Sequence, residues 1–307
     1  MAGEAMGLLL AESGTPLRRA DRFVRSVAGS ESNVAIGLAR LGHRVAFCGR
    51  VGTDAVGGWV RDTLRAEGVD VRALHDDSDR PTGVLLRDNP AGGRPVSVSY
   101  HRTGSAASAL STRDVDEGLV ASARLVFVSG ITAMLSPSAE DFVDHLISVA
   151  TRAGVHVAFD PNVRLRLADV AQWRRTCGRF AGRMDTLLVS KEELHLLELP
   201  ADPAHLLHGR TTTVVVTHGA DGATATTAGG TIGVGARGVI VADPVGAGDA
   251  FTAGWLSAWL RGLPPADALR EAAAVASLVV SVPTDIAGLP TPRERDQVLL
   301  SGRDVDR

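Results

Sequence analysis

The sequence predicts an α/β protein in which a doubly wound, mostly parallel sheet carries helices on both faces and a small β-sheet lies beside it. Short apolar runs rich in β-branched residues alternate with longer segments of helical period along most of the chain, a pattern typical of βαβ units. Two stretches, residues 8–27 and 82–102, contain no helical period and predict the separate small sheet. An α/β chain of 307 residues can form a single domain, and we expect one domain over residues 1–307.

The expected elements follow one another in order. Helices are predicted at residues 33–41, 56–66, 139–153, 249–260 and 266–280, and strands at 45–48, 125–128, 155–159, 187–189, 214–216 and 239–242. Gly42, Gly68 and Gly154 stand close after three of the helices, where glycine commonly ends a helix. In the second β-only stretch, apolar runs flank the turn Asn89–Gly93 and predict a hairpin. A small sheet beside an α/β core often works as a lid; the alternative is an edge insertion without function.

Composition excludes several classes of protein. The net charge of −3 and the pI near 6.3 give no signal for nucleic acid or for a membrane surface. No apolar run approaches the roughly 18 residues that span a bilayer, and no signal-peptide pattern is visible. Cys48 and Cys177 have no metal-binding spacing, which favours a reduced, cytoplasmic protein.

The chain has a single lysine, Lys191, and this limits the groups that could bind a phosphate or a carboxylate. A P-loop is excluded because its lysine is absent, so arginine, backbone amides or a metal must hold any phosphate or carboxylate. Residues Gly233–Gly238 fit G-x-G-x-x-G but precede an expected strand, whereas a dinucleotide site has that motif before a helix. His205 and His208 lack further metal ligands and are interpreted as surface histidines.

The run Asp243–Asp249, D-P-V-G-A-G-D, is the strongest functional signal. It lies before an expected helix, whose first amides have no partner within the helix. Gly246 and Gly248 allow the backbone to approach a ligand, and the helix N-terminus favours phosphate. A carboxylate repels a resting phosphate, so Asp249 is interpreted as a base for an attacking hydroxyl. The alternative is an ordinary Asp at a helix N-cap.

These residues resemble the ribokinase-like (PfkB) family of carbohydrate kinases over essentially the whole chain. Residues Ala28–Asn33, followed by Gly42 and Gly52, are similar to the family's N-terminal signature. The run Asp243–Asp249 is similar to its C-terminal signature, D-T-x-G-A-G-D, with Pro244 in place of threonine. Two signatures in order, about 200 residues apart, are far more specific than either alone.

The family resemblance implies a ribokinase-like fold with a β-sheet lid, and ATP and Mg²⁺ as cofactors; it leaves a monovalent cation such as K⁺ open. It makes Asp249 the catalytic base, with the backbone of Gly246, Ala247 and Gly248 stabilising the transferred phosphoryl group. Because lids in this family often pair between subunits, a homodimer is expected. Family members also begin with a longer first strand, so part of that strand is expected to be missing here.

A closer resemblance is to the 2-keto-3-deoxygluconate kinases. Residues Tyr100–Ala106 are similar to their Y-x-R-x-G-S-A, Asp160–Arg164 to their D-x-N-x-R, and Gly130–Thr132 to their G-I-T. This resemblance implies phosphorylation of a sugar acid at its terminal hydroxyl, most simply 2-keto-3-deoxygluconate to its 6-phosphate. The substrate residues would be Gly29, Asn33, Tyr100, Arg102, Arg164 and Asp249.

The proposed sugar acid fits the chemistry of arginine, whose fork can pair with a carboxylate through two hydrogen bonds. Arg102 and Arg164 could then converge on one carboxylate. The alternative for Arg102 is a solvated arginine on an edge strand, and the alternative for Arg164 is a salt bridge at a helix end. For the whole protein, the alternatives are a kinase of a neutral sugar such as fructose or ribose, and a non-catalytic sugar or nucleotide sensor.

The nucleotide site is also taken from the family resemblance. Ser190 and Glu193 stand at the family's N-x-x-E position, where Glu193 would help order Mg²⁺; the alternative is a solvated acid at a helix start. The segment containing Thr217, Gly219 and Gly222 resembles the turn around ATP, and a plain hairpin turn is its alternative. The cofactor-binding residues would be Ser190, Thr217, Gly219, Gly222, Gly246 and Gly248. Ala273 stands where the family has an asparagine on the adenine side.

Overall fold

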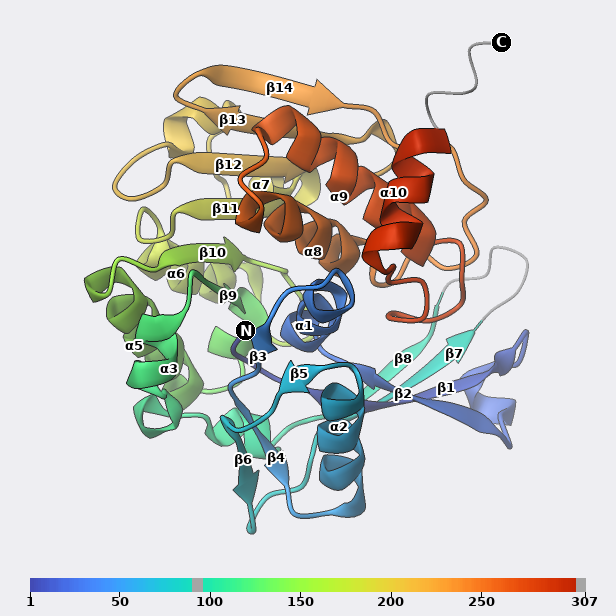
Figure 1. The fold of residues 1–307 in the computed structure, drawn as a ribbon. Helices are drawn as coiled ribbons and strands as arrows, with labels where there is room; N and C mark the ends of the chain where they lie inside the picture. The colour runs from blue at the N-terminus through green and yellow to red at the C-terminus, as the bar shows by residue number, and fades with distance from the viewer. Residues whose placement is uncertain (90–95, 302–307) are drawn as a thin grey trace.

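A computed structural model describes residues 1–89 and 96–301 (Figure 1). Its main sheet has six strands in the order β14-β13-β12-β11-β10-β9. Four of them are parallel, and two antiparallel strands extend one edge. The strands are β9 (Leu125–Ser129), β10 (His156–Asp160), β11 (Thr186–Ser190), β12 (Thr213–Thr217), β13 (Ala223–Thr227) and β14 (Gly230–Val234).

Helices cover both faces of the main sheet, as the apolar strands predict. Phe127 packs with α1 (Ser30–Arg40), α8 (Ala247–Leu260) and α9 (Pro265–Val279) in one core cluster. Its neighbours in β9, Val126 and Val128, belong to a second cluster with α3 (Glu117–Ser122), α5 (Pro137–Arg152) and α6 (Val170–Phe180). Because successive side chains of a strand point to opposite faces, these parallel strands are apolar throughout.

The remaining elements complete the chain. Among the described residues, no helix is long and apolar enough to cross a membrane. The other helices are α2 (Ala55–Ala66), α4 (Gly130–Ala133), α7 (Lys191–Leu196) and α10 (Pro292–Ser301). Two short strand pairs, β3 (Val45–Ala46) with β5 (Val69–Asp70) and β4 (Gly49–Gly52) with β6 (Leu74–Asp77), lie near the N-terminus. The amide of Ala2 donates to the carbonyl of Phe127 in β9, and the amide of Gly3 donates to the carbonyl of Cys48. The start of the chain thus joins these strand pairs to β9.

The two β-only stretches form a separate four-stranded sheet, as predicted. Its order is β2-β1-β7-β8, made of β1 (Met6–Ser13), β2 (Phe23–Ala28), β7 (Val84–Asn89) and β8 (Val98–His101). β7 and β8 are antiparallel, which confirms the hairpin strands. The predicted turn Asn89–Gly93 falls largely outside the described residues. Figure 1 shows this sheet projecting beside α1 and below α8.

The prediction of a strand at residues 239–242 is wrong. Val239, Ile240 and Val241 are 40%, 91% and 57% exposed and belong to no strand. The segment runs from the edge strand β14 toward α8, and its amide at Ala242 donates instead to Val280 O at 2.7 Å. An apolar run becomes a strand only where a neighbouring strand is available to pair with it. The predicted strand at 45–48 is likewise shorter, because pairing ends at Ala46.

Candidate active site

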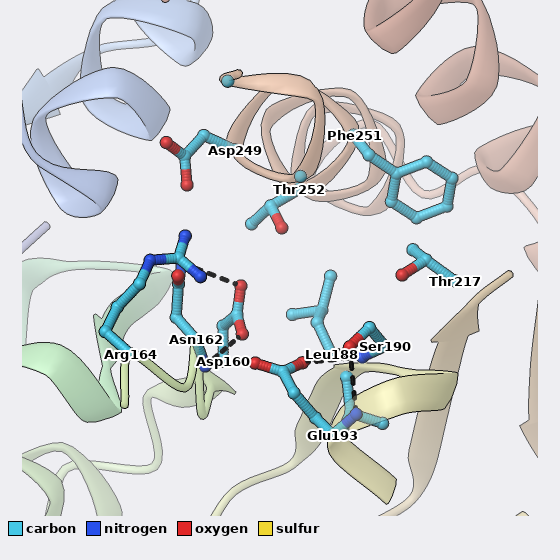
Figure 2. A pocket seen from close by; sticks show the side chains of 13 residues that line it. Asp160, Asn162, Arg164, Leu188, Ser190, Glu193, Thr217, Asp249, Phe251 and Thr252 are labelled. Carbon is cyan, nitrogen blue, oxygen red and sulfur yellow. Dashed lines mark hydrogen bonds between the residues drawn. The ribbon is translucent and has the colours of Figure 1, made fainter. Parts of the chain in front are cut away.

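A pocket lies where the carboxyl ends of β10, β11 and β12 face the start of α8 (Figure 2). Open α/β sheets characteristically bind ligands at this edge. The pocket gathers most of the predicted polar residues of the nucleotide and catalytic sites. It is lined by Asp160, Asn162, Arg164, Leu188, Val189, Ser190, Glu193, Thr217, Gly246, Gly248, Asp249, Phe251 and Thr252.

Asp249 stands in the first turn of α8, and α1 fixes the orientation of its carboxylate. Ser30 Oγ donates to Asp249 Oδ1 at 2.7 Å, and Asn33 Nδ2 donates to Oδ2 at 2.8 Å. Asn162 Nδ2 in turn donates to Ser30 Oγ at 2.9 Å. The predicted base and the predicted substrate residue Asn33 are therefore in direct contact.

The surroundings of Asp249 make its carboxylate more basic than usual. Burial raises the pKa of Asp249, while the hydrogen bonds from Asn33 and Ser30 and the charge of Arg164 lower it in part. A base gains proton affinity when its pKa rises toward the working pH, provided that it stays largely ionised. The carboxylate is thus both positioned and tuned to accept a proton.

The backbone before Asp249 gives α8 an open N-terminus. Gly246 caps the helix in the left-handed conformation, with φ of 85°, and no side chain caps the helix. A glycine is needed there, because a Cβ would lie 2.9 Å from Asp285 O. The first amides of a helix have no partner within it. The amide of Ala247 donates to Pro244 O, outside the helix, at 3.3 Å, and the amide of Gly248 can bind an anion.

The end of β10 and the loop after it bring Asp160, Asn162 and Arg164 to the pocket. Asn162 has a positive φ of 49°, and its amide donates to Asp160 Oδ1 at 2.8 Å. Burial raises the pKa of Asp160 well above its usual value; the charges of Glu193 and Asp249 raise it further, and Arg164 lowers it. Carboxylates gathered so closely favour a bound cation.

Arg164 points into the pocket, between Asp160 and Asp249 (Figure 2). Its guanidinium lowers the pKa of both carboxyls. Within the described parts of the chain, Arg164 forms no ion pair and donates only to Val163 O, at 3.2 Å. The structure therefore shows no helix-end salt bridge for Arg164 among the residues it describes, and the side chain faces the pocket (Figure 2).

Glu193 caps the start of α7, and its predicted contact with Mg²⁺ stays a prediction. Its Oε2 accepts from Ser190 N and Ser190 Oγ, both at 2.8 Å, which forms a capping box at the start of α7. Its Oε1 accepts from Val163 N at 2.6 Å. Because a carboxylate oxygen has two lone pairs, Oε2 is fully used by Ser190, whereas Oε1 keeps one free lone pair. Glu193 and Asp160 therefore fit Mg²⁺, which usually takes few carboxylates and keeps several waters.

The predicted nucleotide turn is only partly within the pocket. Thr217 ends β12 and lines it, whereas Gly219 and Gly222 form the turn into β13. Gly222 has φ of 102°, and a Cβ there would lie 2.0 Å from Val234 O, so packing alone requires this glycine. Ala273 lines a separate hollow between α9, α10 and the residues after β14.

Four predicted substrate residues, Gly29, Asn33, Tyr100 and Arg102, do not line the pocket. Arg102 is buried and pairs with Glu4, and its guanidinium lies 5.5 Å from the ring centre of Tyr100. The alternative of a solvated edge arginine is therefore wrong. Gly29, the N-cap of α1, has φ of 134°, and a Cβ there would lie 2.3 Å from Glu4 O. Convergence of Arg102 and Arg164 on one carboxylate stays a prediction.

Several residues of the site were missed because their contacts are long-range. Ser30 and Asn162 lie within the motifs, but nothing in the sequence pairs them with each other. Asp160 also lies within a motif, and its position beside Glu193 depends on the neighbouring strands β10 and β11. Phe251 and Thr252, which line the pocket from α8, look like ordinary core residues in sequence.

The geometry of the pocket and the α/β fold define a kinase-like class of protein, and comparison with known proteins gives its family. The chain belongs to the pfkB family of carbohydrate kinases, whose model matches residues 3–292. It is 36% identical to a 2-dehydro-3-deoxygluconokinase of Bacillus subtilis, over 99% of this chain and 95% of that protein. An enzyme of the same name from Thermoproteus tenax is also 36% identical, over 97% and 92% of the two chains.

A solved structure agrees with the family. The fructokinase of Xylella fastidiosa with bound ATP superposes with a TM-score of 0.86 at 25% identity, covering 99% of this chain and 98% of that one. The fold class predicted from the sequence is therefore confirmed.

Proposed function

We propose that the protein transfers the γ-phosphate of ATP to the terminal hydroxyl of 2-keto-3-deoxygluconate (2-dehydro-3-deoxygluconate), forming its 6-phosphate. One observation carries the chemistry: Asp249 is held by Ser30 and Asn33 at the open N-terminus of α8, beside Arg164. The names of the two relatives from Bacillus subtilis and Thermoproteus tenax support the choice of substrate.

In the proposed reaction, Asp249 takes the proton of the sugar hydroxyl as its oxygen attacks the γ-phosphorus. The new O–P bond forms while the bond to the β-phosphate oxygen breaks, and ADP leaves. The amides of Ala247 and Gly248 stabilise charge on the transferring group. Glu193 and Asp160 would hold Mg²⁺, which neutralises phosphate charge when bound. Thr217 would contact the nucleotide, whose binding is supported by the ATP in the fructokinase structure.

The carboxylate of the substrate would be bound by Arg164, whose charge has no protein partner among the described residues. Arg102 and Tyr100 would add to this site from the end of β8, on the four-stranded sheet. We propose this sheet as a lid over the sugar, within a single kinase domain. Pairing of two such sheets would give a homodimer, and the protein would act in the cytoplasm.

A coupled assay of ADP release tests this function. Wild-type protein with ATP and Mg²⁺ would be offered 2-keto-3-deoxygluconate, its C4 epimer, gluconate, fructose and ribose. We expect turnover of the keto-deoxy acids. Turnover only of fructose or ribose would retain the kinase and reject the sugar acid, whereas sugar binding without turnover would favour a sensor. Replacing KCl with tetramethylammonium chloride tests a need for K⁺.

A further inference from the structure

A buried arginine joins the four-stranded sheet to the turn that precedes α8. Arg87 lies on β7 and is only 1% exposed. Its Nη2 donates to Asp243 Oδ2 at 2.6 Å, and its Nη1 lies 2.9 Å from Asp285 Oδ1. Asp243 is the first residue of the D-P-V-G-A-G-D run, and Asp285 lies in the loop between α9 and α10. The reaction proposed above gives Arg87 no role.

Both carboxylates belong to segments that shape the start of α8. Asp243 Oδ1 accepts from Val245 N at 3.0 Å, which closes a turn just before the cap. The backbone at Asp285 packs against Gly246 so closely that a Cβ would lie 2.9 Å from its carbonyl oxygen. Arg87 therefore fastens together the two segments that flank Gly246.

The charges at this point are not balanced without Arg87. Asp243 and Asp285 are both almost fully buried, and an unpaired buried carboxylate is strongly unfavourable. Burial raises the pKa of Asp285 to about 6 although Arg87 lowers it, and Asp249 and Asp243 raise it further. Loss of the guanidinium would leave two carboxylates facing each other, and the segments carrying them would move apart.

We propose that Arg87 is a positioning residue for phosphoryl transfer: from β7 it holds the 243–249 turn and the 285 loop together, so that the first amides of α8 and Asp249 keep their places. This inference rests on the proposed kinase function. Arg87 acts through Asp243 and Asp285 and touches no reacting atom. Because the amides act on charge that develops during transfer, its loss lowers kcat and leaves sugar binding nearly intact.

Kinetics of Arg87→Met and a matched control test the proposal. Arg25 serves as the control because it lies on β2 of the same sheet, 5.2 Å from the ring centre of Trp59, and away from the turn. We expect Arg87→Met to lower kcat by about 10- to 100-fold, as small displacements of catalytic groups do. Its sugar KM should change by less than about twofold, and Arg25→Met should match wild type.

Rescue experiments separate positioning from a merely structural role. Added guanidinium ion should restore kcat of Arg87→Ala in a saturable manner and have no such effect on Asp249→Asn. Adding Asp285→Asn to Arg87→Met removes one unpaired carboxylate and should recover part of kcat. If the Arg87 variants do not fold, Asp285→Asn alone, which keeps the Arg87–Asp243 pair, should still lower kcat more than it changes sugar KM.

The contrary results are equally clear. A folded Arg87→Met with wild-type kcat would overturn the positioning role. The positioning role would also be overturned if guanidinium failed to restore kcat and if the loss of kcat simply followed the loss of melting temperature. An inactive wild-type protein would overturn the kinase function itself, whereas an active wild type with an equally active Arg87→Met would overturn only the role of Arg87.

Discussion

Asn33 Nδ2 donates to Asp249 Oδ2 at 2.8 Å across 216 positions of sequence. The first signature of the chain thus holds the carboxylate that the last signature supplies. Because Ser30 donates to the other oxygen of the same carboxylate, α1 and α8 must pack correctly before the base is oriented. The extensive contact of α1 with α8 in the core serves this purpose as well as stability.

Replacing Asp249 with asparagine should remove the base and keep the fold. The shape of the side chain is preserved, but it can no longer accept the hydroxyl proton. We expect kcat to fall by about 10²- to 10⁴-fold, with the affinity for ATP and the melting temperature close to wild type. Turnover assays and calorimetric titration with an ATP analogue would measure both. Near wild-type turnover would reject Asp249 as the base.

The acid limb of activity should report the pKa of Asp249. The base works only when ionised, and burial raises its pKa, so kcat/KM should fall with decreasing pH earlier than for an ordinary aspartate. The hydrogen bond from Asn33 lowers this pKa, because it stabilises the charged form. In Asn33→Ala the acid limb should therefore move to higher pH. A profile of kcat/KM against pH that stays in place, or moves down, would contradict this assignment.

Replacing Arg164 with methionine should mainly affect binding of the sugar acid, whereas replacing Arg102 with methionine should mainly affect stability. Arg164 has no ion-pair partner among the described residues, so its loss should raise KM for the sugar acid by about 10- to 100-fold, as expected for a charged hydrogen bond, with little change in stability. KM for fructose should not rise. Arg102 pairs with buried Glu4, so its loss should lower stability by about 3–5 kcal/mol. Equal effects of Arg164→Met on acidic and neutral sugars would reject the carboxylate contact.

Glu193→Gln should weaken Mg²⁺ dependence beyond what loss of a helix cap explains. Glu294 provides a matched control, because it caps α10 through Thr291 N and Oγ1, both at 2.8 Å, just as Glu193 caps α7. We expect Glu193→Gln to raise the Mg²⁺ concentration for half-maximal activity by about 10-fold or more. Glu294→Gln should leave it unchanged. Magnesium titrations that cannot distinguish the two variants would assign Glu193 to capping alone.

The sequence predicts the fold well where local pattern and tertiary pairing agree. The strand at 125–128 has β-branched residues, a parallel partner in β10 and helices on both faces. Residues 239–242 have a similar apolar run, but β14 already ends the sheet before this segment. The two segments differ in whether a neighbouring strand is available for pairing, and a single sequence does not show which strands become neighbours.

Site residues could be predicted where a sequence motif contains them. They could not be predicted where their role depends on a contact with a residue far away in the sequence. The motifs predicted that Asp249 and Glu193 belong to one site, and both line the pocket; their chemical roles stay predictions. The partner of Arg102 could not, because Glu4 lies 98 positions away and looks like a solvated acid near the chain start. Arg87 was missed for the same reason: in sequence it is one of many arginines on an expected strand, and only the folded chain places it between Asp243 and Asp285.

The conformation at the start of α8 should matter more for turnover than the same conformation at its end. Gly246 and Gly262 flank this helix with φ of 85° and 75°. Alanine at either position should cost about 1 kcal/mol of backbone strain. At Gly262 the space for a Cβ is open, whereas at Gly246 it meets Asp285 O at 2.9 Å.

We therefore expect Gly262→Ala to lose a little stability and keep wild-type kcat. Gly246→Ala should lose similar or greater stability and also lower kcat, because the turn and the 285 loop must separate and the first amides of α8 shift with them. Melting curves and kcat measured on the same two preparations would compare the positions directly. Equal kcat in both variants, at equal melting temperature, would mean that this turn tolerates displacement and that its amides do not contribute to the transfer.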